Sequence, residues 1–126
     1  MSNLNAETIA AAMQAYVDNI TASNLEGIIG LFAEDAVVED PIGSAPVKGH
    51  AALHEFYQAA CDGVAKMVLE GNVRVRDQWG ACAMLAYPKG AEETLAMETL
   101  DVMEFNEQGK IISMTAYWGD SNLRSL

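Results

Sequence analysis

The last third of the chain has a pattern that fits a β-hairpin and few other structures. Apolar residues recur at alternate positions along residues 94–105 and again along 110–118, with the turn sequence Asn106-Glu107-Gln108-Gly109 between them. A period of two places alternate side chains on the same face of a strand. A four-residue loop that pairs Phe105 with Lys110 brings both sets to one face. That face then carries Leu95, Met97, Thr99, Asp101, Met103, Phe105, Ile112, Met114, Ala116 and Trp118.

Shorter strands are expected just before this hairpin. Residues 64–70, 72–76 and 81–87 are rich in apolar and β-branched side chains, and turn residues stand at Gly71, at 77–80 and at 88–91. Short apolar runs bounded by turn residues are typical of strands. Because strands joined by short turns pair antiparallel, the C-terminal half predicts a mainly antiparallel sheet.

The N-terminal half has the period of helices instead. We expect a first helix from the N-cap Asn5 to about Ile20, a second from the capping-box sequence of residues 23–26 through Phe32, and a third that ends at Gly63. Apolar spacing defines the inner faces of the first and third helices. These faces carry Ile9, Met13, Tyr16, Val17 and Ile20, and then Leu53, Phe56, Tyr57 and Ala60. Helices followed by strands indicate an α+β fold.

Size and charge narrow the class of protein. With 126 residues, of which 51% are hydrophobic, the chain is expected to form one domain over residues 1–126. Its net charge of -11 would repel nucleic acid and anionic membranes. Residues 1–4 lack the basic and apolar parts of a secretory signal, and no apolar run reaches a membrane span, so a cytoplasmic protein is expected. Cys61 and Cys82 are expected to be free thiols.

Asp40 stands out at the end of an apolar run. Residues 36–40 are expected to form a strand that cannot continue through Pro41, because proline has no backbone N–H and forces an extended residue before it. Alternation puts Asp40 on the same face as Ala36 and Val38. Two interpretations fit: a solvated residue that caps the strand end, or a general base that faces a pocket.

Asp101 is an acid on the buried face of the final hairpin. Burial disfavours the charged form, so its pKa should rise and the neutral carboxyl would then be a hydrogen-bond donor. The alternative is a structural aspartate satisfied by backbone amides or a distant arginine. Tyr16 and Tyr57 also point inward, either as core tyrosines bonded to carbonyl groups or as neutral donors to a cavity. Two acids and two tyrosines in an apolar cavity suggest proton transfer on an apolar substrate.

His50 and His54 are spaced four residues apart on the third predicted helix. Metal sites use this spacing, but the neighbouring sequence offers no third ligand. We therefore interpret both histidines as surface residues and predict no metal site.

Together these motifs resemble the bacterial steroid delta-isomerases, or ketosteroid isomerases, of the nuclear transport factor 2-like superfamily. The resemblance covers nearly the whole chain, with the spacing kept from Tyr16 through Tyr57 and a short deletion before Asp101. Asp-Pro alone is a weak motif, whereas the set is specific. The matching residues are Tyr16, Val38-Glu39-Asp40-Pro41 with Gly43, Phe56-Tyr57, Leu100-Asp101-Val102-Met103-Glu104-Phe105 and Ala116-Tyr117-Trp118.

The resemblance implies a cone-shaped α+β barrel with an apolar cavity, a homodimer, and a reaction without cofactor or metal. That reaction moves a 5,6 double bond of a 3-oxosteroid to the 4,5 position. Asp40 matches the general base, Tyr16 and Asp101 the oxyanion hole, and Tyr57 a tyrosine bonded to the oxyanion tyrosine. The predicted substrate-binding residues are Val38, Phe56, Met84, Thr99, Met114, Ala116 and Trp118.

The sequence departs from the family pattern at two positions, and two other kinds of function remain as alternatives. Phe32 replaces a third tyrosine of some members, which shortens the hydrogen-bond network, and Ala86 replaces a larger apolar residue, which widens the pocket. The superfamily also holds small polyketide cyclases, dehydratases and epoxide hydrolases. A non-catalytic binding or dimerisation module is the alternative from another class.

Overall fold

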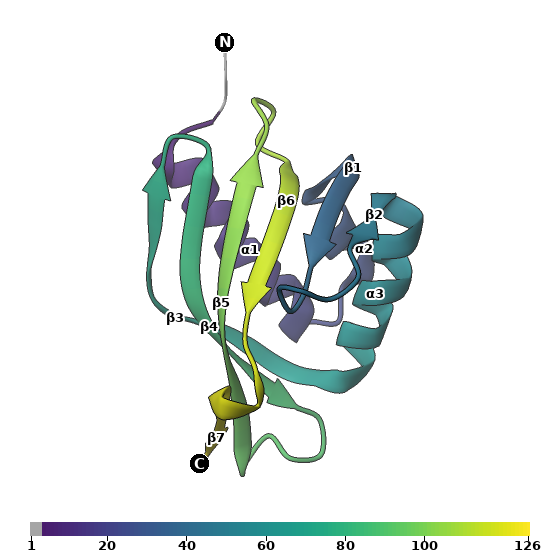
Figure 1. The fold of residues 1–126 in the computed structure, drawn as a ribbon, viewed down its shortest axis with the longest axis vertical. Helices are drawn as coiled ribbons and strands as arrows, with labels where there is room; N and C mark the ends of the chain where they lie inside the picture. Colours follow the sequence, from purple (N-terminus) through teal and green to yellow (C-terminus); the bar gives the residue numbers. More distant parts are fainter. Residues whose placement is uncertain (1–3) are drawn as a thin grey trace.

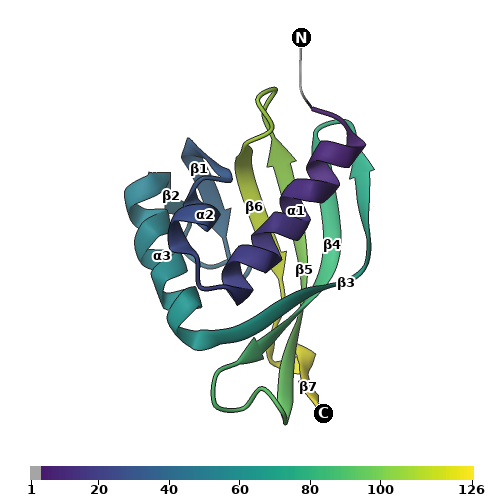
Figure 2. The ribbon, with the colours of Figure 1, turned by 180° about the vertical axis from the view of Figure 1, so that it is seen from behind.

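The computed structural model describes residues 4–126. The prediction that residues 1–4 lack a secretory signal falls mostly on Met1–Asn3, which lie outside the described residues. A curled sheet is covered on one face by helices (Figures 1 and 2). Seen from behind, the long helix α1 crosses the middle strands, while α2 and α3 lie beside β1 and β2 (Figure 2). The predicted α+β class, with three α-helices against a mainly antiparallel sheet, is confirmed.

The three helices follow the predicted periodicity. Helix α1 spans Ala6–Thr21, and Asn5 caps it in a reciprocal capping box with Thr8. Helix α2 is short, Leu25–Ile29, with Asn24 as N-cap. Helix α3 spans Gly49–Gly63. The inner face of α1 is buried against β3 and β4, so Tyr16 lies between α1 and the sheet.

The sheet has the order β2-β1-β6-β5-β4-β3, and β7 pairs with β5 beyond the end of β6. All neighbours pair antiparallel except β1 and β6, which are parallel. Among the described residues no ladder joins β2 to β3, so the sheet is curled but open. The strands are β1 Phe32–Glu39, β2 Val47–Lys48, β3 Val64–Arg76, β4 Trp79–Pro88, β5 Leu95–Phe105, β6 Ile111–Tyr117 and β7 Leu123–Ser125, with the 3-10 turn η1 Asp120–Asn122 before β7.

Three local predictions were wrong, each because tertiary pairing extended or shifted a strand. Phe32 opens β1 instead of ending α2, since it pairs with Ile111 of β6. Gly71 does not end a strand: it has φ +90° inside β3, where the register with β4 shifts. A register shift after Glu104 likewise pairs Phe105 with Ile111, so Ile111 is fully buried in place of Ile112.

Among residues 4–126, no helix combines the length and apolar character that crossing a membrane requires.

Candidate active site

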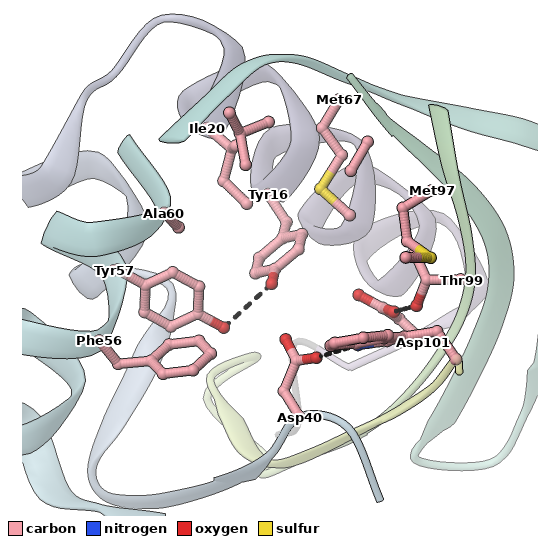
Figure 3. A pocket seen from close by; sticks show the side chains of 13 residues that line it. Tyr16, Ile20, Asp40, Phe56, Tyr57, Ala60, Met67, Met97, Thr99 and Asp101 are labelled. Carbon is pink, nitrogen blue, oxygen red and sulfur yellow. Dashed lines mark hydrogen bonds between the residues drawn. The ribbon is translucent and has the colours of Figure 1, made fainter. Parts of the chain in front are cut away.

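A cavity of about 200 Å³ lies between the helices and the concave face of the sheet. Its wall is mostly apolar, with polar groups from Tyr16 on α1, Tyr57 on α3, Asp40 after β1, and Thr99 and Asp101 on β5. Figure 3 shows the two tyrosine hydroxyls and the two carboxyl groups pointing toward one another. The cavity is lined by Tyr16, Ile20, Asp40, Phe56, Tyr57, Ala60, Val64, Met67, Ala86, Met97, Thr99, Asp101 and Trp118.

Asp40 follows directly on β1 and is held from β6. The amide N of Ile42 donates to the carbonyl of Ala116 at 2.8 Å, which ties the segment after Pro41 to β6. The indole Nε1 of Trp118 donates to Oδ1 of Asp40 at 2.6 Å. Burial raises the pKa of the Asp40 carboxyl, and the Trp118 hydrogen bond lowers it in part. One oxygen of Asp40 is therefore fixed, and the other faces the cavity in Figure 3.

Tyr16 and Tyr57 are buried and share a hydrogen bond of 3.0 Å between their hydroxyl oxygens. Burial raises the pKa of both phenols well above the ordinary value, so both are neutral at physiological pH. Phe32 packs against both rings, with centroids 6.4 Å from Tyr16 and 5.4 Å from Tyr57. Because Phe32 has no hydroxyl, it cannot extend this hydrogen-bonded pair.

Asp101 is the most buried acid of the site, with 1% of its surface exposed. In the sheet it lies between Cys82 of β4 and Ala116 of β6. The hydroxyl of Thr99 donates to its Oδ1 at 2.8 Å. Burial raises the pKa of Asp101 to about 7, a rise that Thr99 opposes and the nearby Asp40 reinforces. Among the described residues no lysine or arginine forms an ion pair with Asp101.

This arrangement combines an acceptor with neutral donors. Asp40 is partly exposed to the cavity and can accept a proton, whereas Tyr16 and protonated Asp101 can donate hydrogen bonds. The apolar wall keeps the local dielectric low, which strengthens each of these interactions. The site is therefore suited to general acid–base chemistry on a mostly apolar molecule.

Comparison with known proteins agrees with this fold. Residues 13–114 match the family model described as a SnoaL-like domain. The chain belongs to the SnoaL-like family. Steroid Delta-isomerase of Nocardioides simplex is a similar protein, 31% identical over 115 residues that cover 91% of this chain and 93% of that protein.

Two further similar proteins are named for a different reaction. Epoxide hydrolase LasB of Streptomyces lasalocidi is 34% identical over 119 residues, covering 82% of this chain; the match spans 39% of the length of LasB. The solved structure of the epoxide hydrolase/cyclase-like enzyme SalBIII has a TM-score of 0.84 to this chain at 22% identity, covering 95% and 97% of the two chains. The similarity to Steroid Delta-isomerase supports an enzyme of isomerase type that acts on a small molecule, and the similarity to SalBIII shows a shared fold.

Within the SnoaL-like fold, the structure brings together most of the predicted site residues. Tyr16, Asp40, Tyr57 and Asp101 all line the cavity, as do the predicted substrate-binding residues Phe56, Thr99 and Trp118. The other predicted substrate-binding residues are buried in the core and are absent from the cavity wall. They are Val38, Met84, Met114 and Ala116.

Six apolar wall residues were not among the predicted substrate-binding residues. Ile20 and Ala60 lie one helical turn beyond Tyr16 and Tyr57, so helical spacing was the signal that located them. Met97 shares the inner face of Asp101, and Ala86 was predicted to widen the pocket, which agrees with its place in the cavity wall. Val64 and Met67 had no such signal, since the curl of β3 brings them to the cavity. The six are Ile20, Ala60, Val64, Met67, Ala86 and Met97.

None of the histidines and cysteines lines the cavity. His50 bonds through Nε2 to the carbonyl of Phe32 at 2.9 Å, and His54 bonds to Glu26 at 3.0 Å. His54 is exposed, whereas His50 is half-buried and not the surface residue we expected. Both cysteines are buried free thiols, as predicted. Residues 4–126 contain no group of three His, Cys, Asp or Glu side chains that could hold a metal ion.

The raised pKa of Asp101 predicts how stability depends on pH. An acid whose folded pKa exceeds its unfolded value keeps a proton that the unfolded chain releases. Its contribution to stability is fully present below the unfolded pKa and is lost as pH rises through the folded pKa of about 7. Between about pH 5 and about pH 8, this loss is on the order of 3 kcal/mol.

We expect Asp101→Asn to remove this part of the pH dependence. The free energy of unfolding, measured by urea denaturation, should fall less between these two pH values in Asp101→Asn than in the native protein. Asp40 is present in both proteins, so the comparison isolates Asp101 together with its interaction with Asp40. If the free energy of unfolding fell by the same amount in both proteins, Asp101 would be ionised in the folded protein over this whole pH range.

Proposed function

We propose that the protein is a cofactor-independent steroid delta-isomerase, which moves the double bond of a 3-oxo-5-ene steroid into conjugation with the ketone. The observation that carries the proposal is the convergence of Asp40, Tyr16 and Asp101 on one buried apolar cavity. The likeness to Steroid Delta-isomerase supports it.

In the first step, Asp40 removes a proton from the carbon between the ketone and the double bond. The electrons of the broken C–H bond form a dienolate, whose negative charge develops on the ketone oxygen. Tyr16 and protonated Asp101 donate hydrogen bonds to that oxygen, and stabilising charge that develops in the transition state lowers the barrier. An ionised Asp101 would repel the same charge, so its raised pKa is required by the mechanism.

In the second step, Asp40 returns the same proton to the far carbon of the original double bond, and the ketone re-forms. One oxygen of Asp40 is held by Trp118 while the carboxyl group delivers the proton from a segment beyond the end of β1. The apolar wall excludes water that would otherwise exchange this proton.

The direct test mixes the purified protein with a 5-ene-3-oxosteroid and follows the ultraviolet absorbance of the conjugated enone. The matched control is the Asp40→Asn protein under the same conditions. Turnover that depends on Asp40 supports the proposal, and turnover no faster than the buffer reaction contradicts it.

Epoxide opening is the second candidate function, favoured by the similarity to Epoxide hydrolase LasB. Neutral Asp101 could donate its proton to the epoxide oxygen while Asp40 accepts a proton from the attacking hydroxyl group. This reaction consumes the proton of Asp101, whereas isomerisation keeps it. An assay of epoxide consumption beside the steroid assay separates the two functions.

Replacing Tyr16 with phenylalanine is expected to lower kcat more than it raises KM. The hydroxyl matters most where negative charge develops, which is in the transition state and not in the bound ketone. The neighbouring hydroxyl of Tyr57 lies 3.0 Å away and can partly replace it, so we expect a loss of roughly tenfold to a hundredfold in kcat. Steady-state kinetics on the steroid measure both constants. A changed KM with an unchanged kcat would make Tyr16 a binding residue only.

We also propose that the protein forms the homodimer expected from the resemblance. Leu100 and Tyr117 are paired across β5 and β6 and are 43% and 46% exposed on the sheet face away from the helices. Large exposed apolar side chains on an uncovered sheet face favour association. Light scattering on the purified protein measures the mass in solution, and a monomer at micromolar concentration contradicts the proposal.

A further inference from the structure

The hydroxyl of Thr99 makes a hydrogen bond inside the cavity that the mechanism above does not use. It donates to Oδ1 of Asp101 at 2.8 Å, and both side chains are buried, with 8% and 1% of their surface exposed. The second carboxyl oxygen of Asp101, Oδ2, has no hydrogen-bond partner among residues 4–126. In Figure 3 the carboxyl group of Asp101 extends from Thr99 toward the space shared with the Tyr16 hydroxyl. The two oxygens of Asp101 therefore have different surroundings.

This difference matters because a neutral carboxyl has one O–H donor and one carbonyl acceptor. If the proton were on Oδ1, it would be donated to Thr99 and the bare carbonyl oxygen would face the substrate oxygen. If the proton is on Oδ2, Thr99 donates to the carbonyl oxygen Oδ1, and the O–H faces the cavity. Only the second arrangement gives an oxyanion donor, and it satisfies the Thr99 hydroxyl as well.

We propose that Thr99 is a positioning residue for the acid of this site: its hydroxyl binds Oδ1 of Asp101 and so keeps the acid proton on the oxygen that faces the substrate. The inference rests on the proposed function, since it assigns the way in which Asp101 becomes an oxyanion donor. Thr99 and Asp101 are two residues apart on β5, so the same strand face carries both groups without any loop between them.

The same bond stabilises the transition state. As charge grows on the substrate oxygen, the hydrogen bond from Oδ2 shifts part of that charge onto the carboxyl group of Asp101. A donor already bound to Oδ1 stabilises this added charge, because neighbouring hydrogen bonds in a chain polarise and strengthen one another. Removal of the Thr99 hydroxyl should therefore cost turnover even though Asp101 stays in place.

The other ionisable groups around Asp101 cannot replace Thr99. Asp40 faces it from the end of β1, Tyr16 and Tyr57 from α1 and α3, and Cys82 from β4. Asp40 is bound to Trp118, the tyrosines are bound to each other, and the thiol of Cys82 contacts the carbonyl oxygens of Gly71 and Ala83. Thr99 is thus the side chain that determines which oxygen of Asp101 is engaged.

Thr99→Val is the decisive variant, because valine has nearly the shape of threonine and suits a strand. Two effects of opposite kind are expected. On the acidic side of the pH–rate profile, kcat should fall about threefold to tenfold, as expected for one hydrogen bond. The alkaline limb should move to higher pH, because Thr99 lowers the pKa of Asp101 and its removal leaves burial unopposed. Thr99→Ser keeps the hydroxyl and should restore both properties.

Infrared spectroscopy of the carboxylic C=O stretch tests the contact without any turnover. The band of protonated Asp101 is identified as the one that Asp101→Asn removes. In Thr99→Val this band should move to higher frequency, since its carbonyl oxygen loses a donor, and should persist to higher pH. If the band and its titration are the same in Thr99→Val and in the native protein, Thr99 does not act on Asp101 and the inference is wrong. If the band shifts but no steroid turns over, the contact stands and the proposed isomerase function fails.

Discussion

Replacing Asp40 with asparagine is expected to lower steroid turnover by about two to four orders of magnitude, the range in which a general base contributes. The amide has the shape of the carboxyl group and can still accept the indole hydrogen bond from Trp118, which in the native protein is 2.6 Å long. It cannot, however, take a proton from carbon. Because the shape is retained, steroid affinity should change little, and the loss should appear in kcat.

Asp35→Asn is a matched control for this experiment. Asp35 lies on the same strand, β1, but is exposed and away from the cavity wall. It removes the same charge from the protein and should leave kcat unchanged. If Asp40→Asn kept activity within tenfold of the native protein, Asp40 would not be the base. If the native protein and the Asp40→Asn protein both bound the steroid and neither turned it over, the non-catalytic binding module would be favoured.

The second large effect is expected at Asp101, where substitutions should rank by the donor that they leave. Asp101→Leu removes the donor and should lower kcat by roughly two to three orders of magnitude, as loss of other oxyanion-hole donors does. Asp101→Asn can donate through its amide and should be the milder change. Steady-state kinetics on the same steroid give the order, and circular dichroism checks that both variants are folded.

The order of these variants reports the protonation state of Asp101. If Asp101 were ionised during catalysis, its charge would oppose the dienolate, and Asp101→Leu would be as fast as the native protein or faster. If it is protonated, native activity should decline as pH rises through the folded pKa of about 7. Asp101→Asn has no such proton to lose, so that alkaline decline should be absent from its profile.

Local pattern predicted a large part of the site, because the direction of a side chain from its own element depends on short-range geometry. Helical spacing placed Tyr16 and Tyr57 on buried faces, and the alternation of residues 94–105 placed Asp101 on the inner face of β5. Pro41 correctly predicted that β1 stops beside Asp40. The roles of these residues came from the family resemblance and stay predictions until they are assayed.

Long-range pairing was beyond the reach of local pattern. The sequence did not predict that β1 lies parallel to β6, although this pairing brings Trp118 to Asp40 across 78 positions of the chain. It also missed the register shift that buries Ile111 in place of Ile112. Periodicity fixes which residues share a face, but not which strand becomes the neighbour.

The sequence by itself thus determined the element types, the inward direction of the two tyrosines and Asp101, and the family. Tertiary structure alone decided which of the inward side chains reach the cavity: Val64 and Met67 line it through the curl of β3, while Met84 and Met114 stay in the core. It also decided that Oδ1 of Asp101 is bound by Thr99. The physical reason is that a side-chain period is set by the backbone of one element, whereas distances across a cavity are set by how curved elements pack together.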